Sequence, residues 1–411
     1  MKDFFLKKEA ASRIFIIFIF AFSILNFRYA YSSLKEIMFE EIHQSSEISI
    51  ANINSIIRNI EHGIDEHIFG KVNFIEAFGY LQLLMDKKEQ SNFEIVKDEE
   101  GLLHFTYFAD RPREVQNLVD RVNIFKESLT DENINFLYVL TPDKYIVGQT
   151  EFAIGLPYNF ENETADEFLR LLNENEIDTV DLRENILKSG MSYSDIFFKT
   201  DHHWTIESSF WAFGELVNAL NENYDMEIDA EGFYTDINNY NVVTYPKSYV
   251  GSLGRQTGKY YSGVDDFSII FPKFSTDFEF SIGFNSLEEN QFSGLFEDVF
   301  ISSYILHRAT DPYDVETDKY FSYLLGNQGI AHIKNTRNPD GLKLAIVKDS
   351  MIVPVISFLA TVSSDIYFID PRYFSDDIAE FINNLEYLDF VMLSFYPQNI
   401  TEQFLPFQTS Q

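Results

Sequence analysis

The stretch Leu342–Met351, which reads LKLAIVKDSM, indicates the fold most directly. Its first six residues predict a short strand buried on both faces, as in parallel sheets. Ser350 follows that strand at once, and Ile352–Ala360 is typical of a helix. A serine on such a strand-to-helix turn exposes its hydroxyl at the carboxyl edge of the sheet, where open α/β sheets place their sites. Taken alone, Ser350 is also consistent with a simple helix cap.

Strands and helices alternate from about residue 95 onward. Thr164–Asn175 predicts an amphipathic helix that begins with the capping-box pair Thr164 and Glu167, and a second helix runs from Thr205 to about Asn221. Short apolar runs predict strands at Phe136–Leu140, Thr179–Leu182, Ile366–Ile369 and Leu388–Leu393. This alternation predicts a doubly wound, mainly parallel α/β sheet.

Residues 225–300 interrupt the alternation. They are rich in Tyr, Phe, Ser, Gly and Asp, with strand-like runs at Phe267–Phe271 and Phe278–Ile282. We expect an irregular, β-rich insertion within the α/β domain. Its aromatic side chains would either shape a carbohydrate groove or pack on the sheet.

The N-terminal segment has the layout of an export signal, because four basic residues precede the apolar run IFIIFIFAFSIL at 14–25. Tyr29-Ala30-Tyr31 is a poor cleavage site, so an uncleaved anchor over 12–32 is favoured over a cleaved signal peptide. The positive-inside bias places 1–11 in the cytoplasm and the rest outside. Residues 33–94 predict a membrane-proximal helical region, with segments Ile48–Ile60 and Ile68–Met85, ahead of a catalytic domain at 95–411.

Composition limits the possible partners. The 411 residues carry a net charge of −34, which repels phosphate backbones and argues against a nucleic-acid partner. There are no cysteines, so disulfides, thiolate catalysis and Cys-ligated metals are excluded. A membrane contact is expected through the inserted segment rather than through surface charge.

The string Thr200–Thr205, TDHHWT, carries the strongest chemical signal, because His is scarce, with 8 in the chain. In an extended segment, Asp201 and His203 would share one side and His202 the other. A carboxylate beside an imidazole can orient it for proton transfer. A metal site at Asp201, His202 and His203 and a purely structural histidine pair are the alternatives, although no HExxH-like partner is present.

At these residues the sequence resembles the DHHW proteins, relatives of the alginate O-acetyltransferases AlgX and AlgJ, which carry SGNH hydrolase-like domains. The resemblance covers roughly residues 100–400 and includes Tyr138–Lys144 (YVLTPDK) and Ile369–Phe374. Ordinary SGNH hydrolases place the Gly-Asp-Ser block first and the Asp–His pair last. Here the order is reversed, as in a circular permutation.

The resemblance implies an SGNH hydrolase-like (flavodoxin-like) fold with Ser350 as nucleophile, His203 as general base and Asp201 as its orienting acid, and no metal or cofactor. Lys348 stands where the SGNH block usually has Gly, so it would crowd the oxyanion hole or lend charge to it. Further candidates for substrate or oxyanion contacts are Gly326, Asn327, His202 and Arg372, although a structural ion pair is favoured for Arg372.

The function that the resemblance implies is extracytoplasmic O-acyl transfer, most simply of acetyl, onto an exported or cell-surface polysaccharide. A multi-pass membrane acyltransferase would supply the acyl group. A carbohydrate acetylesterase with the same triad is the alternative, because water and a sugar hydroxyl attack the same acyl-enzyme. A non-catalytic scaffold or polysaccharide-binding protein is the alternative of another class.

Overall fold

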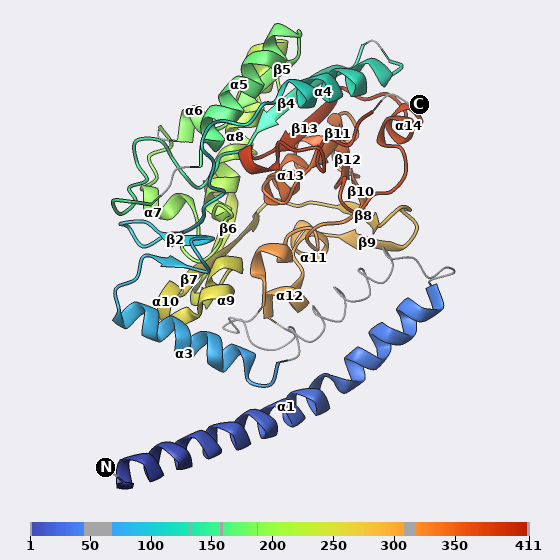
Figure 1. Cartoon of the computed structure of the whole chain (residues 1–411). Helices are drawn as coiled ribbons and strands as arrows, with labels where there is room; N and C mark the ends of the chain where they lie inside the picture. Colours follow the sequence, from blue (N-terminus) through green and yellow to red (C-terminus); the bar gives the residue numbers. More distant parts are fainter. Residues whose placement is uncertain are drawn as a thin grey trace. The chain divides into compact units, whose positions relative to one another are not determined.

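The computed structural model describes residues 2–44, 68–131, 133–156, 159–186, 188–307 and 317–408 (Figure 1). The chain divides into two compact units, Met1–Leu81 and Gln82–Gln411. The helix α1 (Lys2–Gln44) includes the segment 12–32, and α3 (Lys71–Leu84), which begins near the predicted Ile68, contains the boundary between the two units. The predicted helix Ile48–Ile60 lies outside the described residues.

One described helix is long and apolar enough to cross a membrane. It is Ala10–Tyr29 within α1, with a mean hydropathy of 2.0 and none of its described side chains buried. A continuous apolar stretch of about 20 residues matches the thickness of a bilayer core. The helix is therefore a possible single span or signal.

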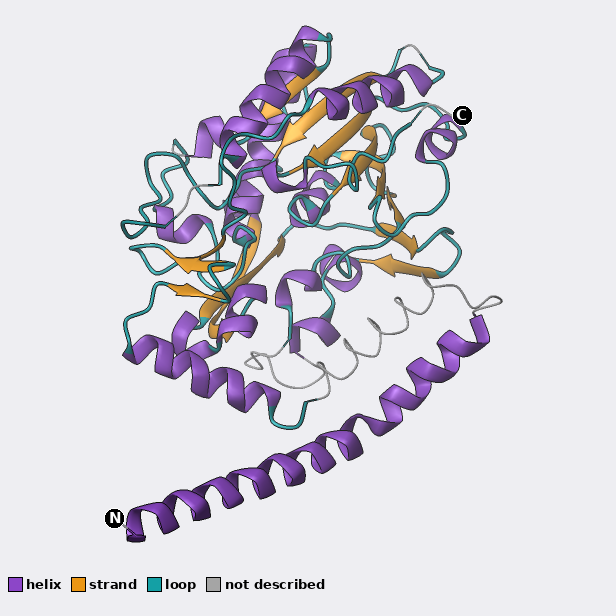
Figure 2. Cartoon of the chain, in the orientation of Figure 1, coloured by secondary structure: helices purple, strands orange, loops and turns teal. Residues whose placement is uncertain are grey.

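The second unit is built on a mixed eight-stranded sheet (Figure 2). Its strand order is β5-β4-β13-β11-β12-β10-β8-β9. The first five of these strands run parallel, and the last three join as antiparallel neighbours. The strands are β4 (Asn135–Leu140), β5 (Asp178–Asp181), β8 (Phe278–Gly283), β9 (Asn290–Gly294), β10 (Ile330–Asn335), β11 (Leu342–Lys348), β12 (Ser363–Ile369) and β13 (Phe390–Phe395).

The parallel strands are buried on both faces because alternate side chains enter two different clusters. On β11, Leu344 and Ile346 pack in one cluster, and Ala345 and Val347 in the other. The first cluster includes residues of α8 (Ile206–Tyr224), α11 (Phe296–Phe300) and α13 (Val353–Leu359). The second includes residues of α4 (Gln116–Ser128), α5 (Glu161–Glu174) and α14 (Ile378–Asn383). The predicted α/β sheet with helices on both faces is therefore confirmed.

The predicted start of the helix at Thr164 is wrong, because α5 begins three residues earlier at Glu161. The residue before it, Phe160, adopts the left-handed conformation (φ 56°) and has no side chain that could cap the helix. Thr164 instead lies in the first turn, where its hydroxyl donates to the Phe160 carbonyl (2.8 Å). The spacing of Thr164 and Glu167 therefore resembles a capping box without forming one.

The segment 225–300 is divided between two sheets. Its first strands, β6 (Tyr240–Tyr249) and β7 (Asp265–Pro272), form a separate antiparallel pair. Its later strands, β8 and β9, extend the main sheet through β10. Only part of the segment is therefore an insertion. A small antiparallel sheet of β1 (Glu89–Gln90), β2 (Ile95–Lys97) and β3 (Leu103–Phe105) was not predicted, because strands this short have no periodicity to detect.

Candidate active site

Ser350 lies on the turn that follows β11, at the carboxyl edge of the parallel strands. Its neighbour Asp349 shapes this turn by accepting hydrogen bonds from the backbone N–H groups of Met351 and Tyr396 and from the Asn399 side chain, each at 2.9 Å. Asp349 thus ties the end of β11 to the segment after β13. Ser350 itself is buried, with 7% of its surface exposed.

Asp201 and His203 come from a bend that leads into α8. An antiparallel bridge between Phe197 and Trp204 closes this bend, and Thr205 begins the helix by accepting from the Ser208 N–H. We call residues 198–203 the DHH loop. The predicted cap at Thr205 is confirmed.

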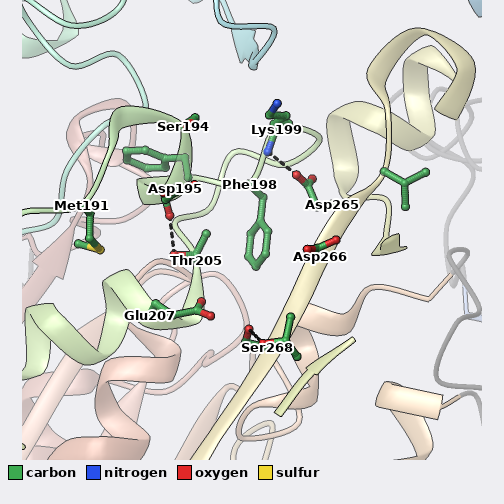
Figure 3. Close-up of a pocket in the computed structure, with 13 residues that line it drawn as sticks. Met191, Ser194, Asp195, Phe198, Lys199, Thr205, Glu207, Asp265, Asp266 and Ser268 are labelled. Carbon is green, nitrogen blue, oxygen red and sulfur yellow. Dashed lines mark hydrogen bonds between the residues drawn. The ribbon is translucent and has the colours of Figure 1, made fainter. Parts of the chain in front are cut away.

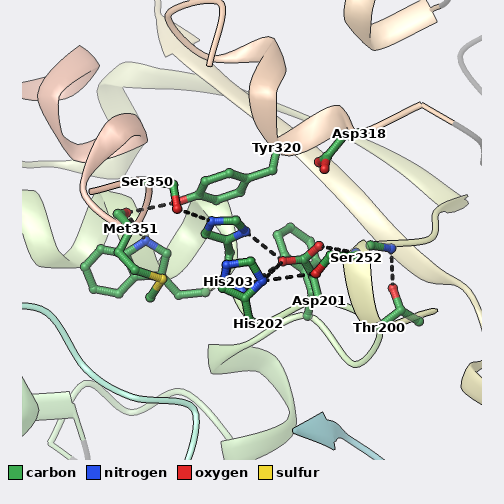
Figure 4. Close-up of polar contacts among 12 residues, drawn as sticks. Thr200, Asp201, His202, His203, Ser252, Asp318, Tyr320, Ser350 and Met351 are labelled. Carbon is green, nitrogen blue, oxygen red and sulfur yellow. Dashed lines mark hydrogen bonds and ion pairs between the residues drawn. The ribbon is translucent and has the colours of Figure 1, made fainter. Parts of the chain in front are cut away.

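The fold brings the three predicted triad residues into one hydrogen-bonded series (Figure 4). His203 Nδ1 lies 2.7 Å from Asp201 Oδ1, and His203 Nε2 lies 2.8 Å from Ser350 Oγ. The His203 ring stacks on Tyr320, with ring centroids 3.9 Å apart, and the Tyr320 hydroxyl donates to the Met351 carbonyl (2.8 Å). This arrangement can transfer a proton between a serine hydroxyl and an imidazole whose other nitrogen faces a carboxylate.

The Asp201 carboxylate is held by several donors besides the imidazole. It accepts from the Tyr249 hydroxyl (3.0 Å) and from the Ser252 N–H (2.6 Å). Burial by itself raises the pKa of Asp201, but the charges and hydrogen bonds of His203 and His202 hold it well below its usual value. Asp201 is therefore ionised.

Gly251 is a residue of this site that sequence reasoning missed. A Cβ atom at Gly251 would lie 2.2 Å from Asp201 Oδ2, so no side chain fits there. Its own N–H donates to the Thr200 hydroxyl (2.8 Å). Nothing in the sequence around Gly251 signals this close approach, because it depends on two segments 50 residues apart.

His202 does not point away from Asp201, so that prediction is wrong. Its Nδ1 lies 3.2 Å from Asp201 Oδ1 and 3.1 Å from Ser252 Oγ. Its ring centroid is 3.8 Å from that of His203. The reason is that the DHH loop is a bend rather than an extended strand, so side chains two apart no longer alternate between faces.

Asp201, His202 and His203 could also hold a metal ion, because one ligand atom from each lies within 4.8 Å of the others. In the described part of the chain no fourth Cys, His, Asp or Glu joins this group. The same ligand atoms are already engaged with one another in the Asp201–histidine contacts. We therefore expect chelators to leave esterase activity unchanged, as measured by dialysis against EDTA. Loss of activity that zinc restores would support the metal site instead.

The burial of His203 sets the expected pH dependence. Burial lowers the pKa of His203 below its usual 6.5, and the His202 charge lowers it further, while Asp201 opposes both. A general base acts only when neutral, so kcat/KM should be constant at neutral pH and fall as the pH drops through this lowered pKa. The measurement is kcat/KM for an acetyl ester between about pH 4 and 9. An acid limb centred above about pH 7 would contradict the assignment.

The remaining candidates form a separate ionic cluster. Arg372 binds both oxygens of Asp370 (2.9 and 2.7 Å), and Lys348 Nζ binds Asp370 Oδ2 (3.2 Å) and Asn327 Oδ1 (2.8 Å). Lys348 is fully buried, and its charge is compensated by Asp370. Gly326 (φ 79°) lies against the Phe321 ring. Among the described residues, no hydrogen bond joins Gly326, Asn327 or Arg372 to Ser350 or His203, and their roles as substrate or oxyanion contacts stay predictions.

Two cavities adjoin the DHH loop. The larger one, of about 610 Å³, is lined by residues that include Phe198, Lys199, Asp265 and Glu207, and by none of the three triad residues (Figure 3). The smaller one, of about 20 Å³, lies beside His202 and Tyr396. The lining of the larger cavity includes the carboxylates of Asp195, Glu207, Asp265 and Asp266.

A mainly parallel α/β sheet with serine, histidine and aspartate gathered at its carboxyl edge is the arrangement expected of an SGNH hydrolase-like fold. Residues 104–242, about a third of the chain, match the family model of the SGNH hydrolase-like domain of the acetyltransferase AlgX. The resemblance predicted from the DHHW string is confirmed.

Two solved structures show the same fold. The structure of Bacillus cereus PatB1 with a sulfonyl adduct has a TM-score of 0.60 and 17% sequence identity, and the match covers 77% of this chain and 98% of PatB1. A DHHW family protein from Eubacterium siraeum has a TM-score of 0.55 and 19% identity, with 77% and 96% covered. No curated protein matches this chain in sequence. At such identities the likeness concerns the fold.

Proposed function

We propose that this protein is a serine-dependent O-acyltransferase, most simply an O-acetyltransferase, that acts on a polysaccharide outside the cytoplasm. The hydrogen-bonded series Asp201–His203–Ser350, with distances of 2.7 and 2.8 Å, is the observation that carries the proposal. The match to the AlgX-type domain supports the acyl class of the reaction.

The reaction proceeds in two steps through an acyl-enzyme. Ser350 Oγ attacks the carbonyl carbon of the acyl donor while its proton passes to His203 Nε2, and the protonated imidazole then returns that proton to the leaving group. In the second step a sugar hydroxyl attacks the carbonyl carbon of the acyl-serine, and its proton passes through His203 Nε2 to Ser350 Oγ, which leaves as the free hydroxyl. The ionised Asp201 stabilises the imidazolium in both steps.

The Ser350 backbone N–H is a candidate oxyanion donor. Within the described residues it makes no hydrogen bond, whereas the adjacent N–H groups of Asp349 and Met351 are engaged with Ser394 O and Asp349 Oδ1. A free N–H beside the nucleophile is suited to stabilise negative charge on the attacked carbonyl oxygen.

The apolar helix α1 supports a position at the membrane surface. An anchor there would place the catalytic domain outside the cytoplasm, beside a multi-pass membrane acyltransferase that supplies acyl groups. Proximity of this kind raises the effective concentration of a bound donor. The acceptor is a polysaccharide at the outer face.

The test uses the full chain in detergent with a chromogenic acetyl ester. Mass spectrometry of the digested protein should detect an adduct of about 42 Da, one acetyl group, on the peptide that contains Ser350. Adding oligosaccharide acceptors then separates the two activities: acetylated sugar indicates a transferase, and release of acetate alone indicates an acetylesterase. A folded protein that yields neither an adduct nor turnover would contradict the proposal and favour a scaffold.

A further inference from the structure

A buried ammonium group binds the backbone of the DHH loop. Lys144 follows β4 at the carboxyl edge of the sheet and is 4% exposed. Its Nζ donates to the carbonyls of Phe198 (2.6 Å), Lys199 (3.2 Å) and Asp201 (2.6 Å). An ammonium group has three protons, so the whole donor capacity of Lys144 is used on this one loop.

A carboxylate binds the same loop through its N–H groups. Asp265 on β7 accepts from the backbone N–H groups of Lys199 (2.9 Å) and Thr200 (2.8 Å) and from the Thr200 hydroxyl (2.6 Å). Burial lowers the pKa of Lys144 to about 8, against the opposing charges of Asp265 and Asp201, so the group is mainly protonated at neutral pH. The loop is thus held by a cation on its carbonyls and an anion on its amides.

The carbonyls of Phe198 and Asp201 depend on Lys144. In the described ranges neither of them accepts another hydrogen bond, whereas the Lys199 carbonyl also accepts from the Leu103 N–H (2.9 Å). Without the ammonium group, two buried carbonyls would lack a donor, which is unfavourable. The loop would have to turn them toward water, and this movement would displace the backbone of Asp201.

We propose that Lys144 is a positioning residue that holds Asp201 and His203 in reach of Ser350. The inference rests on the proposed function of these three residues. It requires no contact between Lys144 and substrate, because the effect acts through the backbone of the loop. A shift of about 1 Å at a catalytic group can reduce a rate about 100-fold.

The test measures the reaction of Ser350 with phenylmethanesulfonyl fluoride in the full chain. Ser350 Oγ attacks sulfur, an O–S bond forms, fluoride leaves, and His203 takes the hydroxyl proton. Lys144→Met should reduce the second-order rate about 100-fold, measured by intact mass on folded protein. Lys144→Gln, which retains two N–H donors, should reduce this second-order rate about tenfold. It provides the test if the Lys144→Met variant does not fold.

Lys97→Met is the matched control. Burial likewise lowers the pKa of Lys97 to about 8, and its Nζ donates to the Tyr261 carbonyl, but among the described residues it makes no hydrogen bond or ion pair with the DHH loop. The second-order rate of its reaction with phenylmethanesulfonyl fluoride should stay within about twofold of the rate of the natural chain. A fall in Lys97→Met as large as in Lys144→Met would show that general destabilisation is the cause and would overturn the inference.

A chemical rescue separates the ammonium group from general packing. Because the chain has no cysteine, Lys144→Cys provides a single thiol, which bromoethylamine converts into a lysine analogue in the unfolded chain before refolding. The refolded, alkylated variant should regain the natural rate. Full folding without regained reactivity would overturn the role of Lys144. If the natural chain itself fails to react at Ser350, the proposed function fails instead.

Discussion

Ser350→Ala is expected to abolish acyl-enzyme formation and to reduce kcat/KM for an acetyl ester by at least about 10⁴-fold. The variant removes the only atom that forms the covalent bond, while His203 and Asp201 keep their own hydrogen bond. Ester hydrolysis by the variant and its intact mass after incubation with substrate are the measurements.

Ser394→Ala is the control for this experiment. Ser394 is a fully buried serine on β13, paired in register with Lys348 on the neighbouring strand, and its hydroxyl has no hydrogen-bond partner among the described residues. Its loss should leave the rate unchanged. A Ser350→Ala protein that keeps more than about a tenth of the natural rate would reject Ser350 as the nucleophile.

Asp201→Asn is expected to reduce kcat/KM by about 10⁴-fold while the protein stays folded. An amide nitrogen facing His203 Nδ1 would donate rather than accept, so the proton of the imidazole would move to Nε2. That nitrogen could then no longer accept the Ser350 proton, although the distances in the site would change little. Steady-state kinetics and thermal melting report the two effects separately.

Asp98→Asn is the matched control, because Asp98 and His104 form a second buried pair, with Asp98 Oδ2 2.9 Å from His104 Nε2. Burial lowers the pKa of His104 to about 4, so this histidine is neutral like His203. The control should lower the melting temperature without a comparable loss of rate. Equal losses of rate in the two variants would mean that catalysis does not depend on the tautomer of His203.

Much of the sheet could be predicted because its strands are buried on both faces. Continuous apolar runs such as those of β4 and β11 leave few alternatives to a central parallel strand. The short strands β1 and β9 carry no such signal and gain their structure from hydrogen bonds to neighbours. The strand β8 was predicted from its own residues but assigned to an insertion, because its pairing with β10 in the main sheet depends on a partner about 50 residues further along the chain.

The candidate site was predictable only in part. Asp201, His203 and Ser350 are chemical types that stand out in the sequence, and they follow recognisable turn and cap signals. Gly251 and Lys144 carry no such signal in the sequence. Gly251 acts by allowing the close approach of Asp201, and Lys144 acts by donating to backbone carbonyls of the DHH loop. Any sequence contains many glycines and lysines, and only their spatial neighbours give these two a role.

The sequence by itself determined the alternation of strands and helices, the apolar N-terminal helix and the choice of candidate reactive groups. Local periodicity and turn chemistry are sufficient for these features. Only the tertiary structure decided that His203 meets Ser350, because 147 residues separate them and the sheet brings their two loops to one edge. It also decided that His202 turns toward Asp201, since a bend held by the distant residues Lys144 and Asp265, and not the alternation of a strand, directs its side chain.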